Sequence, residues 1–185
     1  SLAAGGHDYG EGHGHPCALA VATVNDRDEC WIREVRWNDA PNTTWVATNK
    51  REMGAQYHVR PDRWAYDPMQ REAAKSDGAS VAEGDRMVRV GKVEGRAMSR
   101  RIFFDLSGAG VEEAYKQMMR VHLVKQAIPG QGFKFVYHRS DDDLAASIED
   151  LIWMIDKPVS QPPTAARMAV SRSAQPYLNR ASVNG

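Results

Sequence analysis

Three histidines and a cysteine near the start of the chain are the first residues whose types could do chemistry. Within the segment SLAAGGHDYGEGHGHPC they are His7, His13, His15 and Cys17. Imidazole nitrogens and a thiolate are good ligands for zinc or copper. The spacing matches no strong metal-binding template, and the intervening glycines leave the ligands without fixed positions. We therefore favour a polar arm that carries histidines, and we predict no metal ligand here.

A glycine loop at residues 106–110 (LSGAG) lies between a predicted strand and a predicted helix. Such a loop can bind phosphate through free N–H groups and the helix dipole. This one has no P-loop lysine, and Glu112 and Glu113 directly follow it. Because those acids would repel an anion, we interpret the loop as a plain strand-to-helix turn.

Three consecutive aspartates, Asp141, Asp142 and Asp143, form the next candidate. Clustered carboxylates can bind a metal or serve as acid and base. At the start of a helix, the same carboxylates complement the dipole and cap N–H groups. We favour the structural interpretation.

Six basic residues lie on a predicted hairpin of strands 86–93 and 99–106, and they could bind phosphates, acidic lipids or an acidic protein. They are Arg86, Arg89, Lys92, Arg96, Arg100 and Arg101. Aromatic residues nearby raise RNA stacking as a second use. They are Phe103, Phe104, Phe133 and Phe135. The segments RIFF and FKF are typical of core strands under a helix, so nucleic-acid binding is possible but disfavoured.

Nucleophile motifs are absent from the sequence. There is no G-x-S-x-G context, and Cys30 has no evident base partner. We therefore predict that the protein is not an enzyme and has no catalytic or cofactor-binding residue.

The elements that must position these residues are clearest over residues 85–156. Alternation there predicts a hairpin, and helical spacing predicts two helices, which gives a ββαβα order. The predicted elements are strands 86–93 and 99–106, helix 111–128, strand 132–138 and helix 141–155. Strands 99–106 and 132–138 should be parallel, joined by a right-handed crossover.

The rest of the chain is predicted to be simpler. Residues 1–17 and 157–185 are extended arms, one rich in Gly and His and the other basic. Residues 18–84 combine a short β-meander with a Pro- and aromatic-containing excursion. The meander's strands are 18–24, 30–37 and 43–48, and a short helix follows at 68–75. The chain is thus predicted to be α+β, with the ββαβα core of residues 85–156 built as a small two-layer sandwich.

Composition limits the function classes. The 185 residues are 42% hydrophobic and 26% charged, values typical of globular proteins. Lys plus Arg and Asp plus Glu both number 24, and this zero net charge argues against a dedicated nucleic-acid binder. No apolar stretch approaches the ~20 residues of a membrane span. The sequence leaves open whether its two cysteines, Cys17 and Cys30, form a bridge.

The neutral charge, the Gly/His-rich head and the missing initiator Met are similar in style to supernumerary subunits of mitochondrial inner-membrane complexes. This resemblance implies a non-catalytic accessory subunit of the respiratory chain or ATP synthase, in the matrix or at the periphery of the inner membrane. Residues 1–17 and 157–185 would contact neighbouring protein subunits. Two alternatives remain: a mitoribosomal or other ribonucleoprotein subunit, and a small metal-binding protein that uses the N-terminal histidines.

Overall fold

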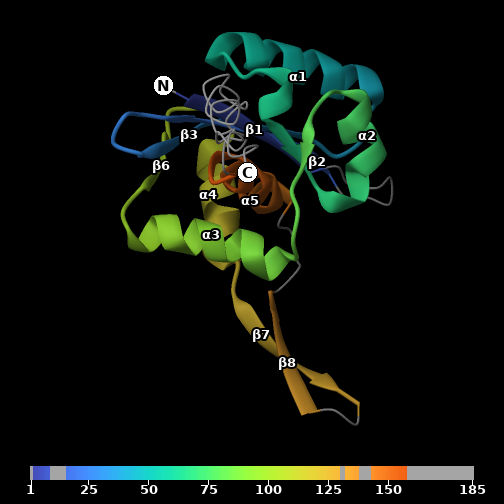
Figure 1. Ribbon diagram of the computed structural model, residues 1–185, viewed down its shortest axis with the longest axis vertical. Coiled ribbons are helices and arrows are strands. Elements are labelled where there is room, and N and C mark those ends of the chain that lie inside the picture. The colour runs from blue at the N-terminus through green and yellow to red at the C-terminus, as the bar shows by residue number, and fades with distance from the viewer. Residues whose placement is uncertain (1, 9–15, 130–131, 138–142, 158–185) are drawn as a thin grey trace, which may run out of the picture.

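A mixed sheet organises the part of the chain that the computed structural model describes, residues 2–8, 16–129, 132–137 and 143–157. Within these residues the strand order is β5-β4-β1-β2-β3-β6 (Figure 1). The strands are β1 (Leu2–Asp8), β2 (Cys17–Val24), β3 (Cys30–Asn38), β4 (Trp64–Tyr66), β5 (Ser80–Val81) and β6 (Ile102–Phe104). β1, β2 and β3 are antiparallel neighbours, whereas β4 runs parallel to β1, β5 to β4 and β6 to β3.

Helices pack on this sheet and bury its apolar side chains. In the described residues the α-helices are α1 (Thr43–Tyr57), α2 (Arg71–Ser76), α3 (Arg86–Met98), α4 (Val111–Arg120) and α5 (Asp143–Ile155). α3, α4 and α5 lie on one side of the sheet, and α1 and α2 lie on the other (Figure 1). The α+β class and the packing of helices on a sheet are confirmed. None of the described helices is long and apolar enough to cross a membrane.

The main core lies between the sheet and α5. Small residues of the strands, such as Ala4 and Ala20, meet large ones of the helix, such as Leu144 and Ile148, and all four are buried. α5 carries apolar residues at helical spacing, and this pattern predicted it correctly. A second cluster, which includes Leu19 and Met53, fills the space under α1.

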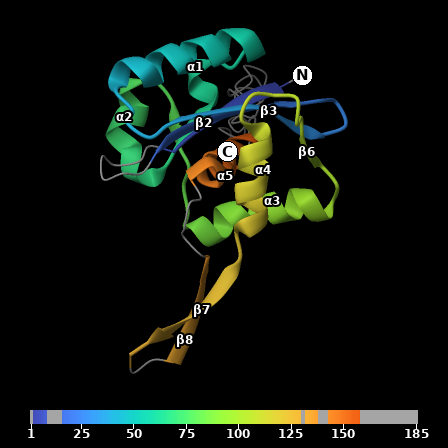
Figure 2. The ribbon, with the colours of Figure 1, turned by 180° about the vertical axis from the view of Figure 1, so that it is seen from behind.

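A hairpin projects from the side of the molecule that holds α3 and α4 (Figure 2). It consists of β7 (Leu123–Ile128) and β8 (Gly132–Tyr137), which pair with each other in a separate antiparallel sheet. The predicted strand 132–138 is therefore present, but its parallel pairing with strand 99–106 is wrong. The helix predicted over residues 111–128 ends at Arg120, and residues 123–128 form the strand β7 instead.

The first residues of the chain correct the predicted N-terminal arm. Leu2–Asp8 forms β1, which lies between β2 and β4 inside the sheet. The glycines that suggested an arm are needed for packing. A Cβ on Gly5 would meet the Trp64 ring at 2.4 Å, and a Cβ on Gly6 would meet the Ser147 carbonyl oxygen at 1.8 Å.

Two further segments differ from the prediction. Residues 86–93 alternate as a strand does, yet they belong to α3, so the predicted hairpin with 99–106 is wrong. Residues 43–48 have strand propensity, yet they begin α1, because the Asn42 side chain caps that helix by accepting a hydrogen bond from the Trp45 N–H. The predicted strands 18–24 and 30–37 and the short helix at 68–75 are present. Residues 158–185 lie outside the described residues, so their contact with partner subunits stays a prediction.

Candidate functional site

Two aspartates end neighbouring parallel strands. His7 of β1 is in register with Tyr66 of β4, so the next residues, Asp8 and Asp67, follow side by side. The Asp67 N–H donates to the His7 carbonyl at 3.2 Å, which holds the two strand ends together. Since side chains alternate along a strand, Asp8 lies on the same face as Gly6, against which α5 packs. Both carboxylates therefore lie on the α5 side of the sheet.

α5 brings a third carboxylate to this place. Asp150 is 1% exposed, and burial raises the pKa of its carboxyl well above the ordinary value. The Arg89 guanidinium lowers that pKa, and the negative charges of Asp8, Asp67 and Glu149 raise it. In the described residues, neither carboxylate oxygen of Asp150 has a hydrogen-bond partner. The negative charges of the partly exposed Asp8 and Asp67 thus act on the buried carboxyl of Asp150.

Arg89 of α3 pairs with two of these carboxylates. Its guanidinium lies 3.3 Å from an Asp67 oxygen and 3.3 Å from an Asp150 oxygen. The Arg89 side chain is only 8% exposed, so the contact is shielded from water. One arginine therefore joins the end of β4 to α5.

The other arginines of α3 face acids as well. Arg86 donates to both Glu149 oxygens, at 2.9 and 3.0 Å. Arg96 lies 2.6 Å from an Asp156 oxygen and 3.1 Å from one of Asp28. Members of the basic set that the sequence suggested as a phosphate-binding surface thus hold α3 against α5.

The donor types at the cluster suit a hard divalent cation. Carboxylate oxygens are preferred ligands of Mg²⁺ and Mn²⁺. Asp150 offers two buried oxygens that accept no hydrogen bond from any described residue. No three His, Cys, Asp or Glu residues of the described ranges are gathered closely enough to hold a metal. The chemistry of the donors fits a metal, while Arg89 lies between two of them.

A polar network supports the strand ends from the opposite face. Tyr66 donates a short hydrogen bond to Asp77, and Lys50 lies 2.5 Å from the Tyr66 hydroxyl and 2.9 Å from Asp77. The His7 Nε2 lies 3.3 Å from the Cys17 thiol, and its ring packs edge-on against Tyr66. Burial lowers the pKa of His7 to about 3 and raises that of Cys17 to about 12. These residues anchor the positions next to Asp8 and Asp67.

The positions of His7 and Cys17 bear on the metal site that the N-terminal histidines and cysteine suggested. His7 and Cys17 are buried in the sheet, on the face opposite the three carboxylates. His13 and His15 lie outside the described residues, so a metal site of all four stays untested. Both cysteines are free thiols, which answers the question of a bridge.

The glycine loop and Cys30 have packing roles. A Cβ on Gly108 would lie 1.9 Å from the Arg33 carbonyl oxygen, so this loop is a close approach to β3. Asp143 begins α5, while Asp141 and Asp142 lie outside the described residues. Cys30 is buried in the core.

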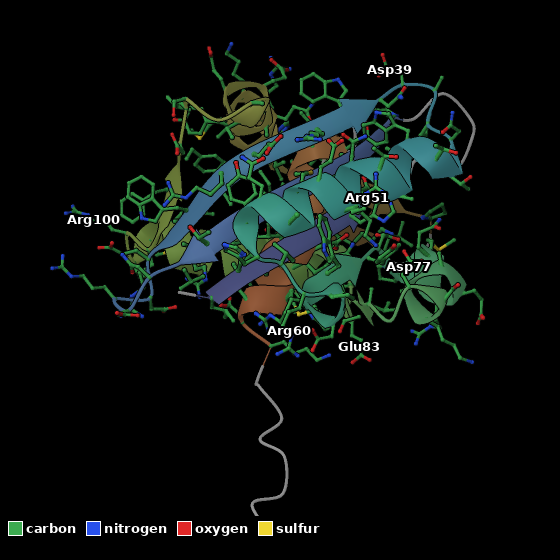
Figure 3. All side chains as sticks on the ribbon, turned by 90° about the horizontal axis from the view of Figure 1, so that it is seen from above. Asp39, Arg51, Arg60, Asp77, Glu83 and Arg100 are labelled. Carbon is green, nitrogen blue, oxygen red and sulfur yellow. The ribbon has the colours of Figure 1, made fainter. Side chains whose placement is uncertain are left out.

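A cavity of about 430 Å³ opens on the α1 side of the sheet. Its lining includes Lys50, Arg51, Trp64 and Asp77, and Figure 3 shows Arg51 and Asp77 on that side. It is therefore separated from the carboxylate cluster by the sheet.

Comparisons with solved structures identify what shares this fold. The nuclease domain of the bacteriophage SPP1 large terminase, with bound Mn, superposes with a TM-score of 0.60 at 10% identity, over 84% of this chain and 85% of that one. The large terminase nuclease of thermophilic phage G20c gives 0.59 at 10% identity, over 81% and 80%. The nuclease domain of the P22 large terminase gives 0.52 at 10%, over 83% and 80%. No model of a known protein family matches the sequence, and no curated protein matches it.

These neighbours overturn the predicted function. The chain has the fold of phage nuclease domains, so the expectation of a non-catalytic accessory subunit of the respiratory chain or ATP synthase is wrong. The predicted absence of enzyme activity is overturned by the same finding, since the neighbours are nucleases, some with bound metals. The mitochondrial location is likewise wrong, because the neighbours come from bacteriophages.

Sequence reasoning named neither Asp8, Asp67 nor Asp150 as a candidate. They are separated by 59 and 83 positions and share no local motif. The sequence does hold one indication of a shared position. Asp8 ends the short segment GGHD and Asp67 ends the short segment WAYD, and both segments otherwise consist of small and aromatic residues. Only the parallel pairing of β1 with β4 makes these two endings neighbours.

Proposed function

We propose that this chain is a metal-dependent nuclease domain that cleaves DNA, of the kind found in phage large terminases. The observation that carries the proposal is the placement of three aspartates at one end of the sheet: Asp8 and Asp67 follow the paired residues His7 and Tyr66, and Arg89 links Asp67 to the buried Asp150 of α5. The fold shared with nuclease domains, one of them with bound Mn and another with bound magnesium, supports it.

Asp8, Asp67 and Asp150 are the residues that would hold divalent cations. When bound there, such a cation supplies an activated water and offsets the negative charge of a phosphodiester. Asp150 is buried and would hold the cation from the interior. Asp8 and Asp67 are partly exposed, so they lie on the side from which DNA can approach.

The protein's own part in the reaction is positioning. The backbone hydrogen bond from Asp67 to His7 fixes the spacing of the two strand ends. The bidentate pair of Arg86 with Glu149 fixes α5, and hence Asp150, against α3. A zero net charge is compatible with a DNA substrate, because a bound cation offsets phosphate charge locally.

The test is cleavage of supercoiled plasmid DNA by the purified chain with Mg²⁺, with Mn²⁺ and with a chelator. Cleavage should require metal, and Asp8→Asn, Asp67→Asn and Asp150→Asn should each lower the rate by about a hundredfold or more, because a bound cation supplies several kcal/mol of transition-state stabilisation. Asp62→Asn is the matched control, because Asp62 is an exposed carboxylate that pairs with Arg60. Metal-independent cleavage, or full activity in the three variants, would show that the proposal is wrong.

A further inference from the structure

The ion pairs between α3 and α5 are of two kinds. Arg86 and Arg96 make close pairs, with distances of 2.9 Å to Glu149 and 2.6 Å to Asp156. Arg89, one turn from Arg86 on the same helix, keeps 3.3 Å from its two partners. Along α3, close ion pairs therefore lie on both sides of a longer one.

The longer pair leaves hydrogen-bonding capacity unused on both sides. The Nε and Nη1 atoms of Arg89 have no hydrogen-bond partner in the described residues, and neither has either carboxylate oxygen of Asp150. Both side chains are nonetheless almost fully buried, at 8% and 2% exposed. Buried polar atoms are normally satisfied, because each unsatisfied group costs about 1–3 kcal/mol. Arg89 and Asp150 thus both keep buried polar atoms without a hydrogen bond to any described residue.

We propose that the Arg89 guanidinium occupies the place of the divalent cation when no metal is bound. In the metal-free protein this guanidinium bridges Asp67 and Asp150, and a metal ion binds only by displacing it. This inference rests on the proposed function, since it takes these carboxylates as metal ligands.

The flanking pairs make the exchange local. Arg86 and Arg96 keep α3 docked on α5, so only the Arg89 side chain has to leave. Until then Arg89 compensates the Asp150 charge, and a buried charge without a partner is strongly destabilising. The arrangement makes metal affinity weaker than the carboxylates alone would give, because part of their attraction is already used.

The test measures Mn²⁺ binding without DNA, by calorimetric titration of the folded chain. Arg89→Met keeps most of the side-chain volume and removes the competing charge. It should bind Mn²⁺ at least about tenfold more tightly than the wild type, which corresponds to about 1.4 kcal/mol. Its thermal midpoint should be lower without Mn²⁺ and should rise more when Mn²⁺ is added.

Arg96→Met is the matched control, since it removes another buried arginine of α3, one that pairs with Asp156 directly after α5. It should lower the thermal midpoint and leave the Mn²⁺ affinity at the wild-type value. Should Arg89→Met fail to fold, Arg89→Lys takes its place, because a compact ammonium cannot span both carboxylates as a planar guanidinium does. It should still bind Mn²⁺ more tightly than the wild type.

The outcomes separate this inference from the proposed function. One outcome is that the wild type and the Arg89 variants bind Mn²⁺ with equal affinity, and that Asp67→Asn abolishes this binding in both. It would overturn the proposed role of Arg89 and would leave the proposed metal site intact. No Mn²⁺ binding in any variant, or binding that Asp67→Asn leaves unchanged, would overturn both.

Discussion

Gly6→Ala is the change for which the structure gives the sharpest expectation. A Cβ at this position would lie 1.8 Å from the Ser147 carbonyl oxygen and 2.7 Å from the Leu151 nitrogen. Both atoms belong to the backbone of α5, so no side-chain rotation relieves the clash. Ordinary contact begins near 3.4 Å, and α5 would have to move by about 1.6 Å. Overpacking of this kind costs about 1–3 kcal/mol, occasionally more.

The same displacement should disturb the site. Asp150 lies on α5 between Ser147 and Leu151, so moving the helix carries this carboxylate away from β1. A misplacement of about 1 Å can cost about a hundredfold in rate. We therefore expect Gly6→Ala to unfold at lower urea concentration than the wild type and to cleave DNA about a hundredfold more slowly while still folded.

Gly91→Ala is the control for this experiment. Gly91 lies within α3, and a Cβ there meets nothing within 4 Å. Alanine in a helix interior should stabilise the chain by about 0.5–1 kcal/mol. Wild-type stability and cleavage rate in Gly6→Ala would refute the packing of α5 on β1 that positions the site.

Two further predictions concern buried groups. Glu149→Gln removes the negative charge that pairs with Arg86 at 2.9 Å. Urea denaturation should show a free energy of unfolding lower by about 3 kcal/mol. A loss below about 1 kcal/mol would contradict the stabilising role of this ion pair. Burial raises the pKa of the Cys30 thiol from 9.0 to about 12, so its contribution to stability is complete below pH 9 and is lost as the pH rises towards 12. Between pH 8 and 10.5 the wild type should lose about 2 kcal/mol more stability than Cys30→Ala, and equal losses would count against the burial of that thiol.

Much of the fold follows from local sequence patterns. β2, β3 and α5 have apolar residues at strand or helix spacing, and they form where those patterns place them. The failures have physical reasons. In α3 the positions that face α5 include Arg89 and Arg96, and polar residues at buried positions hide the helical period.

The sequence did not predict the strand β1, because the residues of this segment have low strand propensity. Glycine is weak in strands, so LAAGGHD is typical of an arm rather than of a strand inside a sheet. Gly5 and Gly6 are there because a Trp64 ring and the α5 backbone come too close for any side chain. Such contacts join residues far apart in the chain, and no local pattern indicates them.

The candidate site was missed for a related reason. Asp8 lies in a segment taken for an arm, and Asp150 lies in a helix where an acid is expected to be exposed. Neither residue type nor spacing distinguishes them from the other acids of the chain. The pairing of β1 with β4 and the packing of α5 on β1 are what bring them together.

Anomalous diffraction from a crystal of the chain grown with Mn²⁺ tests the central claim most directly, because it locates the metal. The account predicts an anomalous peak within coordinating distance of carboxylate oxygens of Asp8, Asp67 and Asp150, with the Arg89 guanidinium moved out of its place between Asp67 and Asp150. A crystal that binds Mn²⁺ only at other acids, with Arg89 still bridging these two aspartates, would contradict it.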